Sequence, residues 1–237
     1  MPTIETVRQT GSTNADLLAR FKSGEPIPEG YWLVADRQES GRGRMGRVWA
    51  GGAGNFMGST LIRLNQGDPP PATLSFVAGI AVHEAVAPLL DRPDLLVLKW
   101  PNDLLLGGAK LAGILLEAWQ GGVVAGIGVN LASAPAIEGQ ETIALGEIGI
   151  APDRDAFAMQ LAARFESGLA RWRNYGKAAL LSRWLQLAHA EGTPMTVHEP
   201  GGAVVQGKFA GLDADGALKL RLADGTIRLV HAGDVST

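Results

Sequence analysis

The chain has 237 residues, 46% hydrophobic and 19% charged, so it is long enough to bury a full-sized core and has an ordinary globular composition. Its net charge of −3 gives no overall field that would draw it to nucleic acid or anionic lipid. The absence of cysteine excludes disulfides, thiolate nucleophiles and cysteine-based zinc sites. With no signal segment and no run of 18 apolar residues, we expect a cytoplasmic protein that does not contact a membrane.

The first predicted elements lead into a glycine-rich loop. Ser12 is a typical N-cap for a helix that runs to about Lys22, and residues 31–35 have the apolar composition of a strand. The following motif, GRGRMG at 41–46, matches the dinucleotide fingerprint G-x-G-x-x-G, which requires a helix directly after the glycines. Here residues 48–58 are rich in glycine and residues 59–64 favour another strand, so dinucleotide binding is not predicted.

Three arginines distinguish this loop from a dinucleotide site. Arg42, Arg44 and Arg47 alternate with glycines, and their guanidinium groups can pair with carboxylate or phosphate oxygens. On an acidic chain this local cluster indicates a small anionic ligand. A solvated loop or a contact with nucleic acid is also compatible with the pattern.

The rest of the chain predicts an α+β fold with a mixed β-sheet flanked by helices. A helix is expected over 72–90, a strand over 95–100, a hairpin of 104–106 and 110–119 around Gly107-Gly108, a strand over 123–130, and two helices over 153–174 and 177–190. After Glu191, short strand-like segments alternate with turn signals, which predicts a small C-terminal β-barrel. We therefore expect a catalytic domain over residues 1–190 and a barrel domain over 191–237.

Two lysines near the predicted hairpin are candidate site residues. The motif KWPND places Lys99 and Asp103 at the end of a strand, where ligand sites of α/β sheets are common, and Lys110 follows the Gly107-Gly108 turn. A lysine at the mouth of an apolar strand can polarise a carboxyl or phosphoryl oxygen, although hairpin lysines usually face solvent. The four histidines lack metal-ligand spacing, and the P-loop-like GAVVQGK at 202–208 lacks the required Ser or Thr.

Taken together, the motifs resemble those of biotin protein ligases in order and spacing. The matching stretches are STN at 12–14, Gln38 with GRGRMGRVW at 41–49, KWPND at 99–103, KLAGILLE at 110–117 and GIGVNL at 126–131. In that family, the carboxylate of biotin attacks the α-phosphate of magnesium-ATP to give biotinyl-adenylate. A lysine of a biotin carboxyl carrier protein or domain then takes the biotinyl group. The resemblance thus implies biotin as substrate, with ATP and Mg²⁺.

The resemblance also implies roles for individual residues. The residues expected to contact biotin are Ser12, Thr13, Asn14, Gln38, Gly41, Arg42, Gly43, Arg44, Lys110 and Gly113. Those expected to contact ATP are Arg44, Trp49, Lys99, Asn102 and Asn130, with Trp49 stacking on the adenine and Asn130 hydrogen-bonding to it. The catalytic set is Arg42, Lys99, Asp103 and Lys110, with Lys110 holding the reacting carboxyl oxygen and Asp103 near Mg²⁺.

The chain departs from the family pattern at two points. Met45 stands where the family often has a third arginine, so activity is expected with an altered affinity of the loop. The first motif already begins at Ser12, which leaves no room for an N-terminal winged helix, so we expect a ligase that does not bind DNA. A homodimer joined through a strand edge is compatible with the family. The alternatives are a lipoate or octanoate ligase and a non-catalytic module that binds nucleic acid through the arginine loop.

Overall fold

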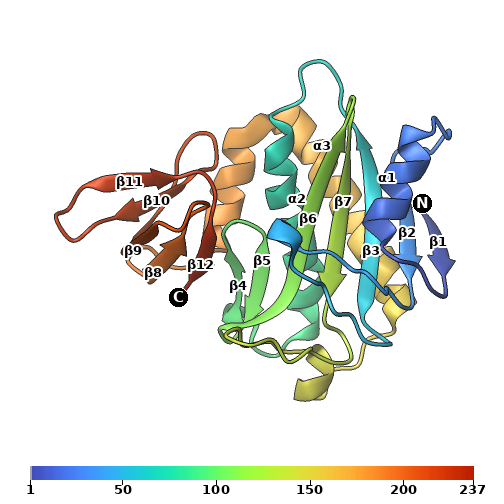
Figure 1. Ribbon diagram of the computed structural model, residues 1–237, viewed down its shortest axis with the longest axis horizontal. Helices are drawn as coiled ribbons and strands as arrows, with labels where there is room; N and C mark the ends of the chain where they lie inside the picture. The colour runs from blue at the N-terminus through green and yellow to red at the C-terminus, as the bar shows by residue number, and fades with distance from the viewer. Residues whose placement is uncertain (1) are drawn as a thin grey trace.

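The computed structural model describes residues 2–237, which form a mixed seven-stranded sheet and an antiparallel five-stranded sheet (Figure 1). In the larger sheet β1 and β2 are parallel, and every other neighbouring pair is antiparallel. Its strands, in spatial order, are β1 (Thr3–Val7), β2 (Tyr31–Ala35), β3 (Phe56–Arg63), β7 (Gly122–Val129), β6 (Ala109–Trp119), β5 (Asp103–Leu106) and β4 (Leu96–Lys99). The predicted mixed sheet is therefore confirmed, while β1 was not predicted.

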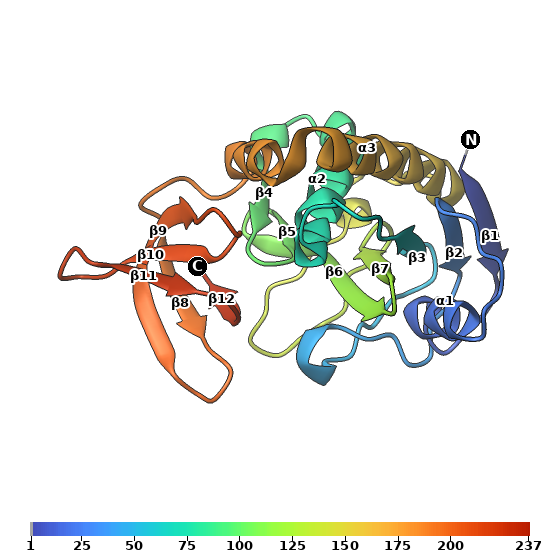
Figure 2. The same cartoon turned by 90° about the horizontal axis from the view of Figure 1, so that it is seen from above.

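Helices cover both faces of the larger sheet, with α2 (Leu74–Val86) and α3 (Arg154–Gln186) on one side and α1 (Thr13–Lys22) on the other (Figure 2). Ser12 caps α1 as expected, because its hydroxyl accepts a hydrogen bond from the Ala15 amide at 3.4 Å. The buried Leu17 seats this helix against Tyr31, Leu33 and neighbouring apolar side chains. The helix that carries the candidate STN motif is thus held firmly on the sheet.

The other two helices pack against the larger sheet and form the main apolar core with it. Segment Pro71–Leu89 is apolar and long enough to cross a membrane, but most of it is buried between the sheet and α3, which accounts for its composition. The two predicted helices over 153–174 and 177–190 form the single element α3, which is broken at Gly176, where φ is 73°. A left-handed backbone of this kind suits glycine, and it changes the direction of the chain.

The C-terminal sheet is open, so the predicted β-barrel is wrong in this respect. Its strands lie in the order β11 (Ile227–Val230), β10 (Leu218–Arg221), β9 (Val204–Leu212), β8 (Pro194–His198) and β12 (Asp234–Ser236). In residues 2–237 the edge strands β11 and β12 do not pair with each other. Turn signals predict short strands, but barrel closure depends on the pairing of the first and last strands, which turn signals do not encode.

The C-terminal sheet packs beside β4, β5 and the end of α3 (Figure 1). Trp100 is buried at this junction, and its indole N–H donates to the Gly216 carbonyl at 3.0 Å. Backbone atoms of Leu98 and Leu187 are also hydrogen-bonded, at 2.8 Å. The KWPND motif therefore lies where the two sheets meet, close to both the arginine loop and the C-terminal strands.

Candidate active site

A cavity of about 450 Å³ lies on the α1 side of the larger sheet, bounded by α1, the arginine loop, strands β6 and β7, and the loop 133–142. Of the residues expected at the site, those that line this cavity are Ser12, Thr13, Asn14, Gln38, Arg42, Gly43, Arg44, Trp49, Asn102, Asp103, Lys110, Gly113 and Asn130. The fold thus brings together motifs that are up to 118 positions apart in the chain. The exceptions are Gly41 and Lys99.

Both exceptions lie next to the cavity and support it. The Gly41 carbonyl accepts a hydrogen bond from the Trp49 amide at 2.8 Å, which closes the base of the arginine loop. A Cβ at position 41 would lie 2.4 Å from the Trp49 carbonyl oxygen, so only glycine fits. Lys99 points toward the C-terminal sheet, where its ammonium group donates to the Val235 carbonyl at 3.0 Å.

One end of the cavity carries a connected set of polar side chains. Gln38 Oε1 accepts a hydrogen bond from the Thr13 amide at 2.8 Å and lies 3.1 Å from the Thr13 hydroxyl oxygen. The Thr13 and Ser59 hydroxyls lie 2.7 Å apart, and Ser59 donates to Asn14 Oδ1 at 2.8 Å. Thr13, Asn14 and Ser59 are almost fully buried, so a ligand at this end would meet oriented polar groups in place of water.

A carboxylate between two lysines occupies the middle of the site. Asp103 Oδ1 lies 2.8 Å from Lys110 Nζ, and Asp103 Oδ2 lies 3.5 Å from Lys99 Nζ. All three side chains are at least 85% buried, so their charges interact more strongly than surface pairs do. The three residues together carry a net charge of +1, which favours an anionic group beside Lys110. The arrangement is therefore compatible with the prediction that Lys110, which follows the hairpin turn, polarises a carboxyl or phosphoryl oxygen.

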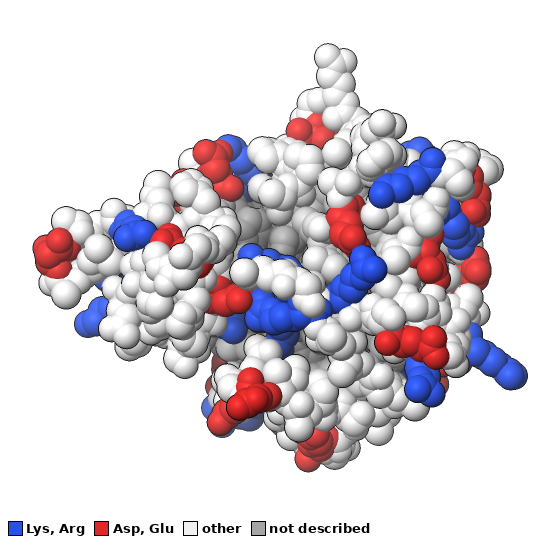
Figure 3. Space-filling view, viewed as in Figure 1, with Lys and Arg blue, Asp and Glu red and all other residues white. Residues whose placement is uncertain are grey.

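The arginine loop forms the outer wall of the cavity. Arg44 Nη1 donates to Asn102 Oδ1 at 3.1 Å, and burial lowers the pKa of the Arg44 guanidinium, an effect that the nearby Asp234 and Asp103 oppose. Figure 3 shows Lys and Arg atoms gathered in the middle of this face, beside the hollow between the two parts of the molecule. The loop thus offers positive charge to a ligand that enters from solvent.

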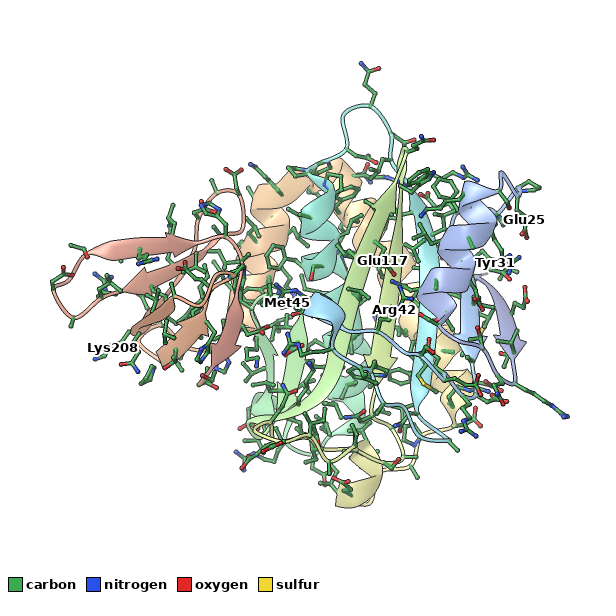
Figure 4. All side chains as sticks on the ribbon, viewed as in Figure 1. Glu25, Tyr31, Arg42, Met45, Glu117 and Lys208 are labelled. Carbon is green, nitrogen blue, oxygen red and sulfur yellow. The ribbon has the colours of Figure 1, made fainter. Side chains whose placement is uncertain are left out.

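Figure 4 places Arg42 and Met45 on the loop segment in front of β6 and β7. Met45 has φ 54° and a 65% exposed side chain, so it does not face the cavity. An arginine at position 45 would project into solvent from this backbone. The departure from the family pattern therefore removes a surface charge and leaves the cavity wall intact.

Trp49 covers the glycines of β6 and β7. A Cβ at Gly128 would lie 2.2 Å from the nearest indole atom of Trp49, and one at Gly113 would lie 3.0 Å away. Lys110 Nζ is 5.9 Å from the centroid of the Trp49 ring, at the limit of a cation–π contact. The glycines that the sequence places inside these strands thus allow the indole to approach the sheet closely.

Asn130 presents an unused acceptor. Its Nδ2 donates to the carbonyls of Ile143 at 3.2 Å and Lys110 at 3.4 Å, whereas Oδ1 is buried and has no hydrogen-bond partner within residues 2–237. A buried acceptor without a partner is costly, and a ligand N–H donor would satisfy it. The expected hydrogen bond from an adenine to Asn130 stays a prediction, for which this acceptor is free.

The residues present do not form a cage for a metal ion. Within residues 2–237, no three His, Cys, Asp or Glu side chains gather as candidate ligands. Asp103, expected near Mg²⁺, directs one oxygen toward each of two lysines. Since Mg²⁺ at nucleotide sites is held largely by phosphate oxygens and water, the ion would reach this cavity on the nucleotide.

Several cavity residues were not predicted from the sequence. Ser59 belongs to no motif, although its place on a strand opposite α1 brings it between Thr13 and Asn14. The loop 133–142 contributes Pro135, Ile137 and Thr142 to the rim, and it has no distinctive composition. Glu117 lies behind the cavity and accepts a hydrogen bond from Asn14 Nδ2 at 2.8 Å. It is the last residue of the KLAGILLE motif, so the motif was the signal that could have indicated it.

Comparisons with known proteins identify the family of this chain. Residues 7–132 match the biotin/lipoate A/B protein ligase family, and residues 192–237 match the biotin protein ligase C-terminal domain. A biotin–[acetyl-CoA-carboxylase] ligase of Mycobacterium tuberculosis is 41% identical over 98% of this chain and 88% of the relative. One of Paracoccus denitrificans is 41% identical over 90% of this chain and 92% of the relative.

Solved structures give the same result for the fold. The biotin protein ligase from Aquifex aeolicus in complex with biotin and ATP superposes with a TM-score of 0.85 and 26% identity, covering 100% of this chain and 98% of that one. The cavity, the family matches and relatives of this identity and coverage lead to one conclusion: the chain belongs to the biotin/lipoate A/B protein ligase family, as its resemblance to biotin protein ligases implied.

Proposed function

We propose that this protein is a biotin protein ligase, which activates biotin with ATP and transfers it to a lysine of a biotin carboxyl carrier protein or domain. The observation that carries the proposal is the arrangement along one cavity. Along β7, the polar end lies where Asn14 covers Gly126, the Lys110 ammonium group lies beside Gly113, which pairs with Gly128, and the unsatisfied acceptor of Asn130 follows the end of the strand. Biotin, its carboxylate and an adenine would need this order.

In the first step, a carboxylate oxygen of biotin attacks the α-phosphorus of ATP, the bond to the β-phosphate breaks and pyrophosphate leaves. Lys110 would hold the reacting carboxylate, and its buried position makes this interaction stronger than one in water. Arg42 and Arg44 would neutralise the negative charge of the phosphates from the outer wall. The bound Mg²⁺ would add positive charge at the phosphates.

In the second step, the acceptor amine attacks the acyl carbon of biotinyl-adenylate, the bond to AMP breaks and the amine loses a proton. Neither step requires a nucleophile from the enzyme, which agrees with a chain that contains no cysteine. What the site must supply is orientation and fixed charge. The connected side chains around Thr13 and the Lys110–Asp103 pair are suited to both tasks.

The test is the intact mass of an isolated carrier domain after incubation with the protein, biotin and magnesium-ATP. The names of the relatives make the biotin carboxyl carrier domain of an acetyl-CoA carboxylase the first acceptor to use. A gain of one biotinyl group, absent when ATP or the acceptor lysine is removed, is the expected result. If the mass of the carrier domain increases with lipoate or octanoate but not with biotin, the protein is a lipoate or octanoate ligase. If the mass does not increase with any of these acids, the proposal is overturned.

A further inference from the structure

The polar end of the cavity is backed by a carboxylate that does not line the cavity. Glu117 lies on β6, on the same face as Gly113 and Leu115, and its Oε2 accepts from Asn14 Nδ2 at 2.8 Å. Figure 4 shows Glu117 above the loop that carries Arg42. Asn14 lies directly over Gly126 of β7, where a Cβ would be 2.4 Å from its Oδ1, so the amide is pressed against the sheet beside Glu117.

Glu117 is the nearer of two acceptors that determine which end of the Asn14 amide faces Ser59, the other being the Leu115 carbonyl at 3.4 Å from the same Nδ2. An ionised carboxylate can only accept hydrogen bonds, so the amide must turn its NH₂ group toward Glu117 and its oxygen toward Ser59. The Ser59 hydroxyl therefore donates its single proton to Asn14 Oδ1, at 2.8 Å. The 2.7 Å contact between the Ser59 and Thr13 hydroxyls must then use the single proton of Thr13, so this hydroxyl does not also donate to Gln38 Oε1, which lies farther away at 3.1 Å.

The result is a directed chain of hydrogen bonds, from Thr13 to Ser59 to Asn14 to Glu117. Each donor in the chain points away from the ligand and toward Glu117. What remains for the ligand is a row of oxygen lone pairs on Thr13, Ser59 and Asn14, all of which line the cavity. A wall of acceptors favours a ligand that brings N–H donors, such as a cyclic urea, over one that brings none, such as a dithiolane.

We infer that Glu117 is a specificity-determining positioning residue: by orienting the Asn14 amide from behind, it makes this wall select ligands with N–H donors. The inference rests on the proposed biotin ligase function, because the ureido ring of biotin supplies the two N–H groups. Glu117 acts through Asn14 and does not touch the ligand. It therefore affects the affinity for biotin and leaves the affinity for the nucleotide unchanged.

The first experiment measures the Kd for biotin by calorimetry on the full chain and two variants. Glu117→Met removes the acceptor while keeping a side chain of similar length, and we expect its Kd for biotin to rise about tenfold or more, since the buried amide donor loses its shorter hydrogen bond and keeps only the one to the Leu115 carbonyl at 3.4 Å. Glu117→Gln still offers an acceptor oxygen and is expected within about threefold of the natural chain. Desthiobiotin has the same urea without the ring sulfur, and Glu117→Met should weaken its binding by the same factor.

A reciprocal exchange tests the direction of the chain even if Glu117→Met unfolds. Asn14→Asp alone places two carboxylates at the 2.8 Å contact, so its Kd for biotin should rise more than tenfold, about the effect of burying like charges together. In the double variant Asn14→Asp/Glu117→Gln, the amide donates to a carboxylate that still faces Ser59 with an oxygen. We expect it to recover most of the lost affinity.

The outcomes separate this inference from the proposed function. If the natural chain does not bind biotin, the proposed function fails. If it binds biotin but Glu117→Met keeps the affinity within twofold at an unchanged melting temperature, the inference is overturned. It is also overturned if Glu117→Gln loses as much as Glu117→Met, or if the double variant binds no better than Asn14→Asp.

Discussion

Arg47 Nη2 lies 2.5 Å from Asp234 Oδ1, so the arginine loop of the ligase domain is paired with the last strand of the C-terminal sheet. The next residue of that strand, Val235, accepts the hydrogen bond from Lys99 through its carbonyl. Strand β12 therefore touches both the arginine loop and the KWPND motif. This gives the C-terminal domain, which the sequence left without an assigned residue, a physical connection to the site.

Asp234→Asn should loosen the arginine loop of the unliganded protein. The two side chains of this pair are 50% and 37% exposed, and exposed pairs contribute less than about 1 kcal/mol, so a two- to fivefold faster cleavage by trypsin within residues 42–47 is expected. Glu199→Gln, which removes the partly buried partner of Arg228 within the C-terminal sheet, is the control and should not change the rate. Equal cleavage of all three proteins would show that Asp234 does not restrain the loop.

Biotin together with ATP should protect the same loop in the natural chain. Its glycines give the backbone freedom, and besides the contacts of Arg47 with Asp234 and of Arg44 with Asn102, its arginines would gain further partners when carboxylate and phosphates fill the cavity. Limited proteolysis with and without the two ligands measures the effect. We expect cleavage after Arg42, Arg44 and Arg47 to be suppressed at least severalfold, and unchanged cleavage would contradict a loop that orders on the ligands.

Lys110→Ala should lower biotin-dependent pyrophosphate release by about two to three orders of magnitude, because the buried ammonium group stabilises the charge that develops on the reacting oxygens. The variant leaves Asp103 with Lys99 as its remaining partner, so the fold should persist. Lys208→Ala, at an exposed position of β9, serves as the control (Figure 4). A loss of less than about threefold in the Lys110 variant would assign this residue to the rim of the cavity.

Some elements of the fold are predicted by local sequence patterns. The capped helix α1 and the hairpin around Gly107 and Gly108 follow from local patterns, because capping and left-handed turn glycines are properties of adjacent residues. The convergence of Thr13, Lys110 and Asn130 on one cavity was implied by the family resemblance. The hydrophobic periodicity of the sequence does not by itself place any of these three residues near another.

What the sequence did not predict depends on contacts between distant strands. Ser59 completes the polar chain only because β3 and β7 are neighbours in the sheet, and Asp234 reaches Arg47 only because the C-terminal sheet packs beside β4 and β5. The open form of the C-terminal sheet was not predicted for the same reason, because closure into a barrel would require β11 and β12 to pair with each other. Such relationships are set by tertiary packing, and no local signal in the chain encodes them.

Gly128→Ala should displace Trp49 and weaken ligand binding. The added methyl carbon would lie within 2.5 Å of three indole atoms, too close for any real contact, so either the ring or the strand must move. We expect the Kd for ATP in the presence of biotin to rise about tenfold or more, as overpacking of this kind costs about 1–3 kcal/mol. In a double-mutant cycle, Gly128→Ala should have much less effect in a Trp49→Ala background, and additive effects would show that the two residues do not interact.

Acid should destabilise the fold through two histidines, of which His83 is buried and His189 is partly buried. Burial lowers the pKa of His189, with the charge of Lys99 as a second cause, and burial is also the main cause of the lowered pKa of His83. The unfolded chain therefore binds more protons than the folded chain at pH values below about 6.5, so the free energy of unfolding falls as the pH drops through that range.

His189 offers the sharper test because its Nε2 is buried without a hydrogen-bond partner within residues 2–237. Replacing it with Phe should flatten the dependence of unfolding free energy on pH between about 6.5 and 5, measured by urea titration at fixed salt. The exposed His198→Phe is the control and should keep the natural slope. If His189→Phe and the natural chain lose the same stability on acidification, the proton taken up on unfolding belongs to another group, with His83 the next to replace.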